Sequence, residues 1–140
     1  MKATIAVIED SPDNRMLVRA FLGDDYSLVE YDDGEAGLEG LRHSQPDIVL
    51  LDISLPGIDG LEVVRRIRNE ATLRKLPVIA LTAHAMSGDR DRMLAAGFDD
   101  YVSKPIVEVE TLIAAVESNL AHNLASETAT ASLNGGCREI

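Results

Sequence analysis

The sequence predicts an α/β fold, in which a doubly wound sheet of five parallel strands carries helices on both faces. Short aliphatic runs alternate with segments of helical length along most of the 140 residues. Several of the runs are apolar nearly throughout, which is typical of strands that are covered on both sides. Alternation of this kind implies parallel neighbours joined by right-handed crossovers.

The expected strands are short and rich in aliphatic or β-branched residues. They span Thr4–Ile8, Ser27–Tyr31, Ile48–Leu51, Val78–Leu81 and Asp100–Ser103, of which the second and the fifth have the weakest pattern.

The expected helices lie between and after these strands. They span Asn14–Leu22, Asp33–Ser44, Asp59–Glu70 and Ser87–Ala96, and the last helix carries an apolar stripe of Val109, Leu112, Ile113, Val116 and Leu120. Gly97 is a candidate C-cap of the fourth helix. The second helix contains Gly34, Gly37 and Gly40, and each is expected to weaken it relative to alanine.

The length fits one domain, which we assign to residues 1–124. Residues 125–140 turn to Ser, Thr, Ala, Asn and Gly without an apolar stripe, so a disordered tail is expected there.

The composition narrows the classes of partner. A net charge of −11 argues against a nucleic-acid surface, which needs clustered Lys and Arg. No apolar run is long enough to span a membrane and no signal-peptide pattern is present. Cys137 is the single cysteine, so the chain is expected to be cytoplasmic.

Polar residues follow four of the expected strands directly. Glu9 and Asp10 follow the first strand, Asp52 the third, Thr82 the fourth, and Lys104 the fifth. In an open α/β sheet, ligands bind outside the carboxyl ends of the strands, so these side chains are expected to converge.

The chemistry of this set favours phosphoryl transfer. Three carboxylates close together repel one another unless a cation lies between them, and Mg²⁺ suits oxygen ligands. Lys104 adds a positive charge and Thr82 a hydroxyl donor. Asp52 would then be the nucleophile, with its surroundings neutralising charge on the phosphoryl oxygens.

Each residue also has an ordinary interpretation. Glu9 and Asp10 before Ser11–Pro12 are typical of a turn and a helix N-cap. Thr82 resembles a common strand-end threonine, and Lys104 a solvated lysine before the turn at Pro105. The occurrence of all of them at the same end of four strands favours a functional site.

Four motifs carry a family resemblance. They are Ile8–Asp10, Leu51–Gly60, Ala80–Ala83 and Tyr101–Pro105. Because these motifs occur in this order, the chain resembles the receiver domains of bacterial response regulators. The resemblance covers about Lys2–Leu124. The resemblance implies a (βα)5 fold with the flavodoxin-like strand order 2-1-3-4-5.

The resemblance also implies a metal site. Glu9, Asp10, Asp52 and the backbone carbonyl of Ser54 would hold Mg²⁺, for which Mn²⁺ can substitute. Glu9 stands where many members have aspartate, and both residues occur in the family.

Further roles follow from the same motifs. Asp52 would accept the phosphoryl group, Lys104 would bind it through a turn with a cis bond to Pro105, and Thr82 and Tyr101 would switch position. Ser54 is a candidate modulator of dephosphorylation. So is His84, although a loop residue without a chemical role is the alternative for it.

The implied function is that of a phosphorylation-activated switch. A histidine kinase or histidine phosphotransfer protein would donate the phosphoryl group, and an unidentified protein target would bind the face of the fourth helix, fifth strand and fifth helix. Beyond its own phosphotransfer and autodephosphorylation, no enzymatic activity is expected, and a monomer or weak dimer is expected.

The chain begins at Met1 and shows no output domain, which favours a single-domain regulator. A phosphorelay intermediate, or a receiver that serves a hybrid kinase, is the alternative, because Thr82–Met86 resembles such receivers.

Two other classes fit less well. A phosphatase with an aspartate nucleophile needs a carboxylate two residues later as general acid, and Ser54 occupies that position. A flavin or dinucleotide carrier is disfavoured because no G-x-G-x-x-G follows the first strand and no tryptophan is present.

Overall fold

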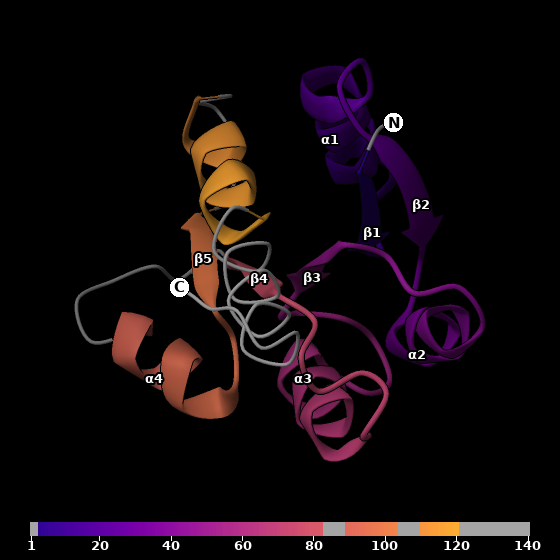
Figure 1. Cartoon of the computed structure of the whole chain (residues 1–140), viewed down its shortest axis with the longest axis vertical. Helices are drawn as coiled ribbons and strands as arrows, with labels where there is room; N and C mark the ends of the chain where they lie inside the picture. Colours follow the sequence, from indigo (N-terminus) through magenta and orange to yellow (C-terminus); the bar gives the residue numbers. More distant parts are fainter. Residues whose placement is uncertain (1–2, 83–88, 104–109, 121–140) are drawn as a thin grey trace, which may run out of the picture.

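The computed structural model describes residues 3–82, 89–103 and 110–120. Its sheet contains five strands in the order β2-β1-β3-β4-β5, and all four pairs of neighbours are parallel. The predicted fold class and strand order are therefore confirmed (Figure 1).

The elements agree closely with the predicted ranges. The strands are β1 (Thr4–Ile8), β2 (Ser27–Tyr31), β3 (Ile48–Asp52), β4 (Val78–Thr82) and β5 (Asp100–Ser103). The helices are α1 (Pro12–Leu22), α2 (Gly34–His43), α3 (Gly60–Asn69) and α4 (Asp89–Ala96), and residues 110–120 are also helical. Residues 87 and 88 of the predicted fourth helix lie outside the described ranges.

Helices cover both faces of the sheet. Figure 1 shows α1 and the helix of residues 110–120 on one face, and α2, α3 and α4 on the other. Two buried apolar clusters correspond to these two layers. All five residues of β3 and of β4 are buried, as the continuous apolar runs predicted, whereas the edge strand β2 is partly exposed.

The helix starts are determined by side-chain caps. Ser11, Asp33 and Asp59 each accept a hydrogen bond from the backbone N–H three residues later, at 3.4, 2.7 and 2.9 Å. The helix α1 begins two residues earlier than predicted because Pro12 occupies its first turn, where a missing N–H costs nothing. At the end of α4, Gly97 has a φ of 118°, as expected of a residue that ends a helix.

The glycines of α2 are needed for close packing. A Cβ atom on Gly37 would lie 2.5 Å from Cδ1 of Ile8, and one on Gly40 would overlap the ring of Tyr31. Alanine at position 37 would therefore press on the fully buried side chain of Ile8, whereas the end of the partly exposed Tyr31 side chain can move away from a Cβ at position 40. These glycines were expected to weaken the helix because of their low helix propensity, which does not include contacts with the sheet.

None of the described helices is long and apolar enough to cross a membrane.

Replacing Gly37 by alanine should lower the free energy of unfolding by about 1–3 kcal/mol, the usual cost of overpacking a core. Helix propensity alone would instead raise it by about 1 kcal/mol. Urea denaturation measures the difference, and the control is Ala36→Gly at an exposed position of the same helix, which should follow propensity. A more stable Gly37→Ala protein would contradict the close contact with Ile8.

Candidate functional site

The strand register brings the predicted polar residues to one edge of the sheet. Ile8 of β1 is paired with Leu51 of β3, so the next residues, Glu9 and Asp52, stand side by side. Asp52 is in turn level with Leu81, the residue before Thr82. Glu9, Asp52 and Thr82 therefore come from three adjacent strands.

These three side chains are also unusual in their burial. Glu9, Asp52 and Thr82 are 0%, 1% and 5% exposed, and they are the buried polar or charged side chains found among the described residues. Burial of a charge is costly unless it is paired, hydrogen-bonded or bound to a metal. Their concentration at one edge identifies it as the candidate site.

Asp10 completes a cluster of three carboxylates. Ligand oxygens of Glu9, Asp10 and Asp52 lie within 4.8 Å of one another, and Asp10 is exposed whereas the other two are buried. Three carboxylate oxygens at this spacing fit a hard divalent cation that keeps several waters, as Mg²⁺ does. The cluster could thus hold the metal predicted from the sequence.

Backbone N–H groups orient the two buried carboxylates. Ser11 donates to Oε2 of Glu9 at 3.0 Å, and Ser54 donates to Oδ1 of Asp52 at 3.1 Å. Ser11 is also the N-cap of α1, which confirms the capping interpretation of this segment and leaves the metal-binding role of Glu9 and Asp10 a prediction. A carboxylate can accept at about four lone-pair sites, so one backbone hydrogen bond does not prevent it from also binding an ion.

The loop after β3 packs tightly on Asp52. The N–H of Gly60 donates to the carbonyl of Ile53 at 2.9 Å, which folds the start of α3 back onto the end of the strand. A Cβ on Gly60 would overlap the Asp52 carbonyl oxygen and lie 2.6 Å from Cα of Ile53. Because backbone atoms cannot move aside easily, glycine is required here for the close approach.

Arg15, which lies one turn into α1, also contacts the site, although it was not among the residues predicted from the sequence. Its Nη1 donates to the backbone carbonyl of Glu9 at 2.8 Å, and its Nε lies 3.3 Å from Oε1 of Glu30 on β2. The signal available in the sequence was a basic residue one turn into the helix that follows the acidic pair. Glu30, its partner on a neighbouring strand, had no recognisable signal.

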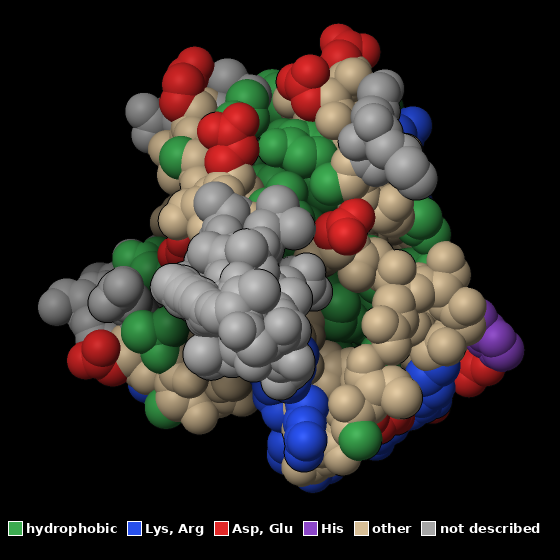
Figure 2. Space-filling view, in the orientation of Figure 1, with side chains coloured by type: hydrophobic (Ala, Val, Ile, Leu, Met, Phe, Trp, Pro, Cys, Tyr) green, Lys and Arg blue, Asp and Glu red, His purple; other side chains and the backbone are tan. Residues whose placement is uncertain are grey.

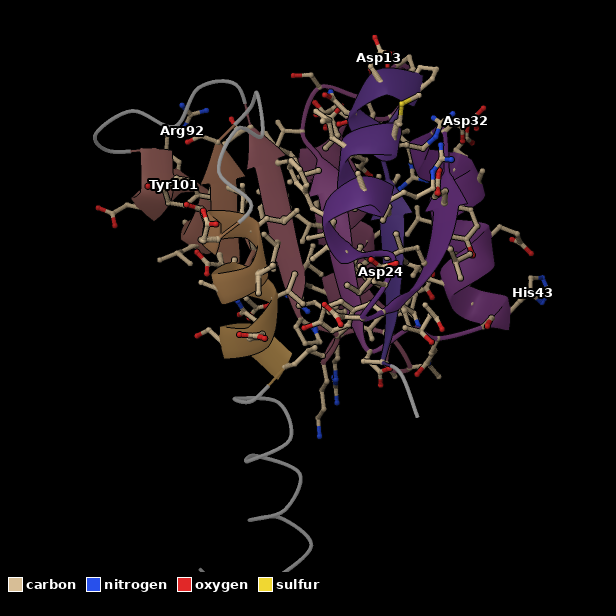
Figure 3. The ribbon with its side chains drawn as sticks, turned by 90° about the horizontal axis from the view of Figure 1, so that it is seen from above. Asp13, Asp24, Asp32, His43, Arg92 and Tyr101 are labelled. Carbon is tan, nitrogen blue, oxygen red and sulfur yellow. The ribbon has the colours of Figure 1, made fainter. Side chains whose placement is uncertain are left out.

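The other predicted site residues are only partly placed. Tyr101 is half-buried on β5 and packs against the cluster beneath α2, α3 and α4; Figure 3 shows it on the side of the molecule away from Asp32 and His43. Ser54 is exposed at the start of the loop after β3. Lys104, Pro105 and His84 lie outside the described residues, so their predicted roles and the cis bond stay predictions.

Many described basic side chains lie away from the acidic cluster. In Figure 2, Lys and Arg gather over α3. Arg68 donates to the carbonyls of Arg74 and Leu76, just before the amino end of β4 and therefore at the opposite edge of the sheet. Arg65 and Arg66 form hydrogen bonds with Glu62 on their own helix and lower the pKa of Glu62 to about 2. These three arginines therefore pair with groups outside the acidic cluster.

A family model of the response regulator receiver domain matches residues 5–117. The chain belongs to this family. The match includes β1, β3 and β4, whose carboxyl ends carry the acidic cluster and Thr82.

Two relatives differ in how much of their own length the chain matches. The chain is 36% identical over 121 residues to the polar-differentiation response regulator DivK of Brucella anthropi, and the match covers 86% of this chain and 98% of that protein. It is 39% identical over 106 residues to the histidine-protein kinase BarA of Shigella flexneri. That match covers 75% of this chain but only 12% of BarA, so the likeness is to a small part of the kinase.

Solved structures agree with the fold. The receiver domain of a sensor histidine kinase from Pseudomonas aeruginosa is 32% identical with a TM-score of 0.78, covering 86% of this chain and 99% of that one. It is described with a magnesium ion coordinated in its active-site cleft. A putative response regulator from Chloroflexus aurantiacus gives a TM-score of 0.81 at 29% identity, with coverage of 86% and 99%.

Asp10→Asn should make the metal-free protein more stable, because it removes one of three mutually repelling carboxylates. We expect a gain of about 1 kcal/mol at low ionic strength. Urea denaturation in EDTA measures this gain, and a second series with Mg²⁺ should show a smaller stabilisation of the variant than of the wild type.

Asp24→Asn is the matched control, because it makes the same change of charge beyond the other end of α1 (Figure 3). If Mg²⁺ stabilised the Asp10→Asn and wild-type proteins equally, Asp10 would not belong to a cation site.

Proposed function

We propose that the chain is a phosphorylation-activated switch in a two-component or phosphorelay system and that Asp52 accepts the phosphoryl group. The observation that carries this proposal is the position of Asp52, a buried carboxylate at the end of β3, within the group of Glu9, Asp10 and Asp52. A carboxylate nucleophile beside a cation site is an arrangement that supports phosphoryl transfer to the carboxylate.

In this proposal Glu9, Asp10, Asp52 and the carbonyl of Ser54 hold the metal. Mg²⁺ would neutralise charge on the phosphoryl oxygens, and Mn²⁺ can substitute for it. An oxygen of Asp52 attacks phosphorus, a P–O bond forms, and the P–N bond of a phosphohistidine donor breaks with its electron pair returning to the imidazole. The N–H of Ser54, which donates to Oδ1 of Asp52, keeps the carboxylate oriented for this attack.

Two predicted groups would stabilise the product. Lys104 would bind the phosphoryl group as a fixed positive charge, and the hydroxyl of Thr82 would donate to it. The position of Thr82 on β4, next to the strand of Asp52, supports this role. His84 and Ser54 stand beside these residues in the sequence as candidate modulators of dephosphorylation.

The signal would travel through Thr82 and Tyr101. An acyl phosphate adds negative charge and acceptor oxygens, which favours an inward position of Thr82 over its alternative. If the side chain of Tyr101 also moves inward, the surface formed by α4, β5 and the helix of residues 110–120 changes shape. We propose that a downstream protein, rather than nucleic acid or membrane, binds this face, and that the chain is a monomer or weak dimer in the cytoplasm.

The phosphoryl donor would be a histidine kinase or a histidine phosphotransfer protein. A role as phosphorelay intermediate is the second candidate, favoured by the similarity to parts of histidine kinases from Shigella flexneri and Pseudomonas aeruginosa. Rapid return of the phosphoryl group to a phosphotransfer protein would identify a relay intermediate, whereas retention of the group would identify an output switch. An aspartate-nucleophile phosphatase is disfavoured because Ser54 offers no general acid, and measurable turnover of p-nitrophenyl phosphate would revive it.

Incubation with acetyl phosphate and Mg²⁺ should add one phosphoryl group, measured as a mass increase of the intact protein. The adduct should be labile to hydroxylamine, as an acyl phosphate is, and EDTA should prevent its formation.

Asp52→Asn is the test of position, and Asp59→Asn, on an exposed helix cap, is the control. The proposal predicts no adduct on the first protein and a normal adduct on the second. An adduct on Asp52→Asn, or none on folded wild-type protein that binds Mg²⁺, would overturn it.

A further inference from the structure

Arg15 connects the acidic cluster to the edge strand of the sheet. Its guanidinium donates to the Glu9 carbonyl at 2.8 Å and lies 3.3 Å from Glu30, and its side chain is only 19% exposed. Glu30 also pairs with Arg19 at 2.8 Å, so it is held from two successive turns of α1. A planar guanidinium suits such a bridge because its donors have fixed directions.

The bond to Glu9 acts on the peptide that carries Asp10. The Glu9 carbonyl belongs to the Glu9–Asp10 peptide unit, and this unit is planar. On the other side of Glu9, its own N–H donates to the carbonyl of Tyr31 at 3.0 Å. The backbone that presents both acidic side chains is therefore tied to β2 directly through Tyr31 and, through Arg15, to Glu30.

We propose that Arg15 is a positioning residue for the cation site: by fixing the Glu9–Asp10 peptide, it sets how Glu9 and Asp10 meet Asp52, and Glu30 orients it. The inference rests on the proposed function, since it assumes that the cluster binds a divalent cation. Outer-sphere partners of this kind are commonly worth about 10- to 100-fold in metal affinity.

A simple charge effect predicts the opposite result. Arg15 is a cation near the cluster, so its charge alone would repel a second cation, and its removal would tighten binding. Positioning predicts that its removal weakens binding. The sign of the change therefore separates the two explanations.

The test measures affinity for Mn²⁺ by the loss of the electron paramagnetic resonance signal of the free ion. With Arg15→Met we expect the affinity to fall by about tenfold. The double variant Arg15→Met with Glu30→Gln keeps the net charge of the wild type and should also bind Mn²⁺ more weakly. Unchanged or tighter binding in these two proteins would overturn the inference.

Arg19→Met is the matched control. Arg19 lies one turn further along α1 and pairs with Glu30, and its side chain is 53% exposed. This variant makes the same change of charge as Arg15→Met, but it removes only an exposed ion pair. Its affinity for Mn²⁺ should therefore stay within about twofold of the wild type. An equal loss of affinity in both variants would show that Arg15 has no special role.

Urea unfolding in EDTA gives a readout that separates stability from positioning. Both single variants lose an ion pair with Glu30, and Arg15→Met also loses the hydrogen bond to the Glu9 carbonyl, so Arg15→Met is expected to be the less stable. The Mn²⁺ affinities are therefore compared under conditions where both variants are fully folded. If wild-type protein bound no Mn²⁺, the proposed function would fail. If wild-type protein bound Mn²⁺ and Arg15→Met bound it equally well, the inference about Arg15 alone would fail.

Discussion

The mutual repulsion of carboxylates at one edge of the sheet is the constraint on which the rest of the site depends. Glu9 and Asp52 are buried at the ends of adjacent strands, and Asp10 lies beside them. Carboxylates this close repel one another, and the repulsion falls when a cation binds between them. Relief of this repulsion would therefore contribute to the free energy of binding of a cation at this edge of the sheet.

The fold holds these charges in place from several directions. Packing on both faces of β3 and β4 prevents the strands from separating, and Gly60 brings α3 against the Asp52 backbone. Backbone N–H groups of Ser11 and Ser54 orient the buried carboxylates. Contacts from loops and helices around the sheet therefore hold the three carboxylates close together in spite of their repulsion.

Much of this arrangement could be predicted from the sequence, because it is local. Apolar runs mark the strands, and the acidic residues stand directly after them, so sheet topology alone brings Glu9, Asp10 and Asp52 together. The close contacts of Gly37 with Ile8 and of Arg15 with Glu30 could not be predicted, because only the folded chain brings these residues together. Pro12 was a local signal for the start of α1, but the apolar periodicity that predicted this helix does not include it.

The most direct test of the cation site is to locate a paramagnetic ion in the folded protein. Substoichiometric Mn²⁺ added to ¹⁵N-labelled protein should first broaden the amide resonances of Asp10, Asp52 and Ser54, which surround the cluster. Amides of Asp24 and His43, which lie at the carboxyl ends of α1 and α2 and so away from the carboxyl ends of the strands, should stay sharp at the same ratio. Broadening centred on another group of acidic residues, or spread evenly over the surface, would contradict a cation site built by the ends of β1 and β3.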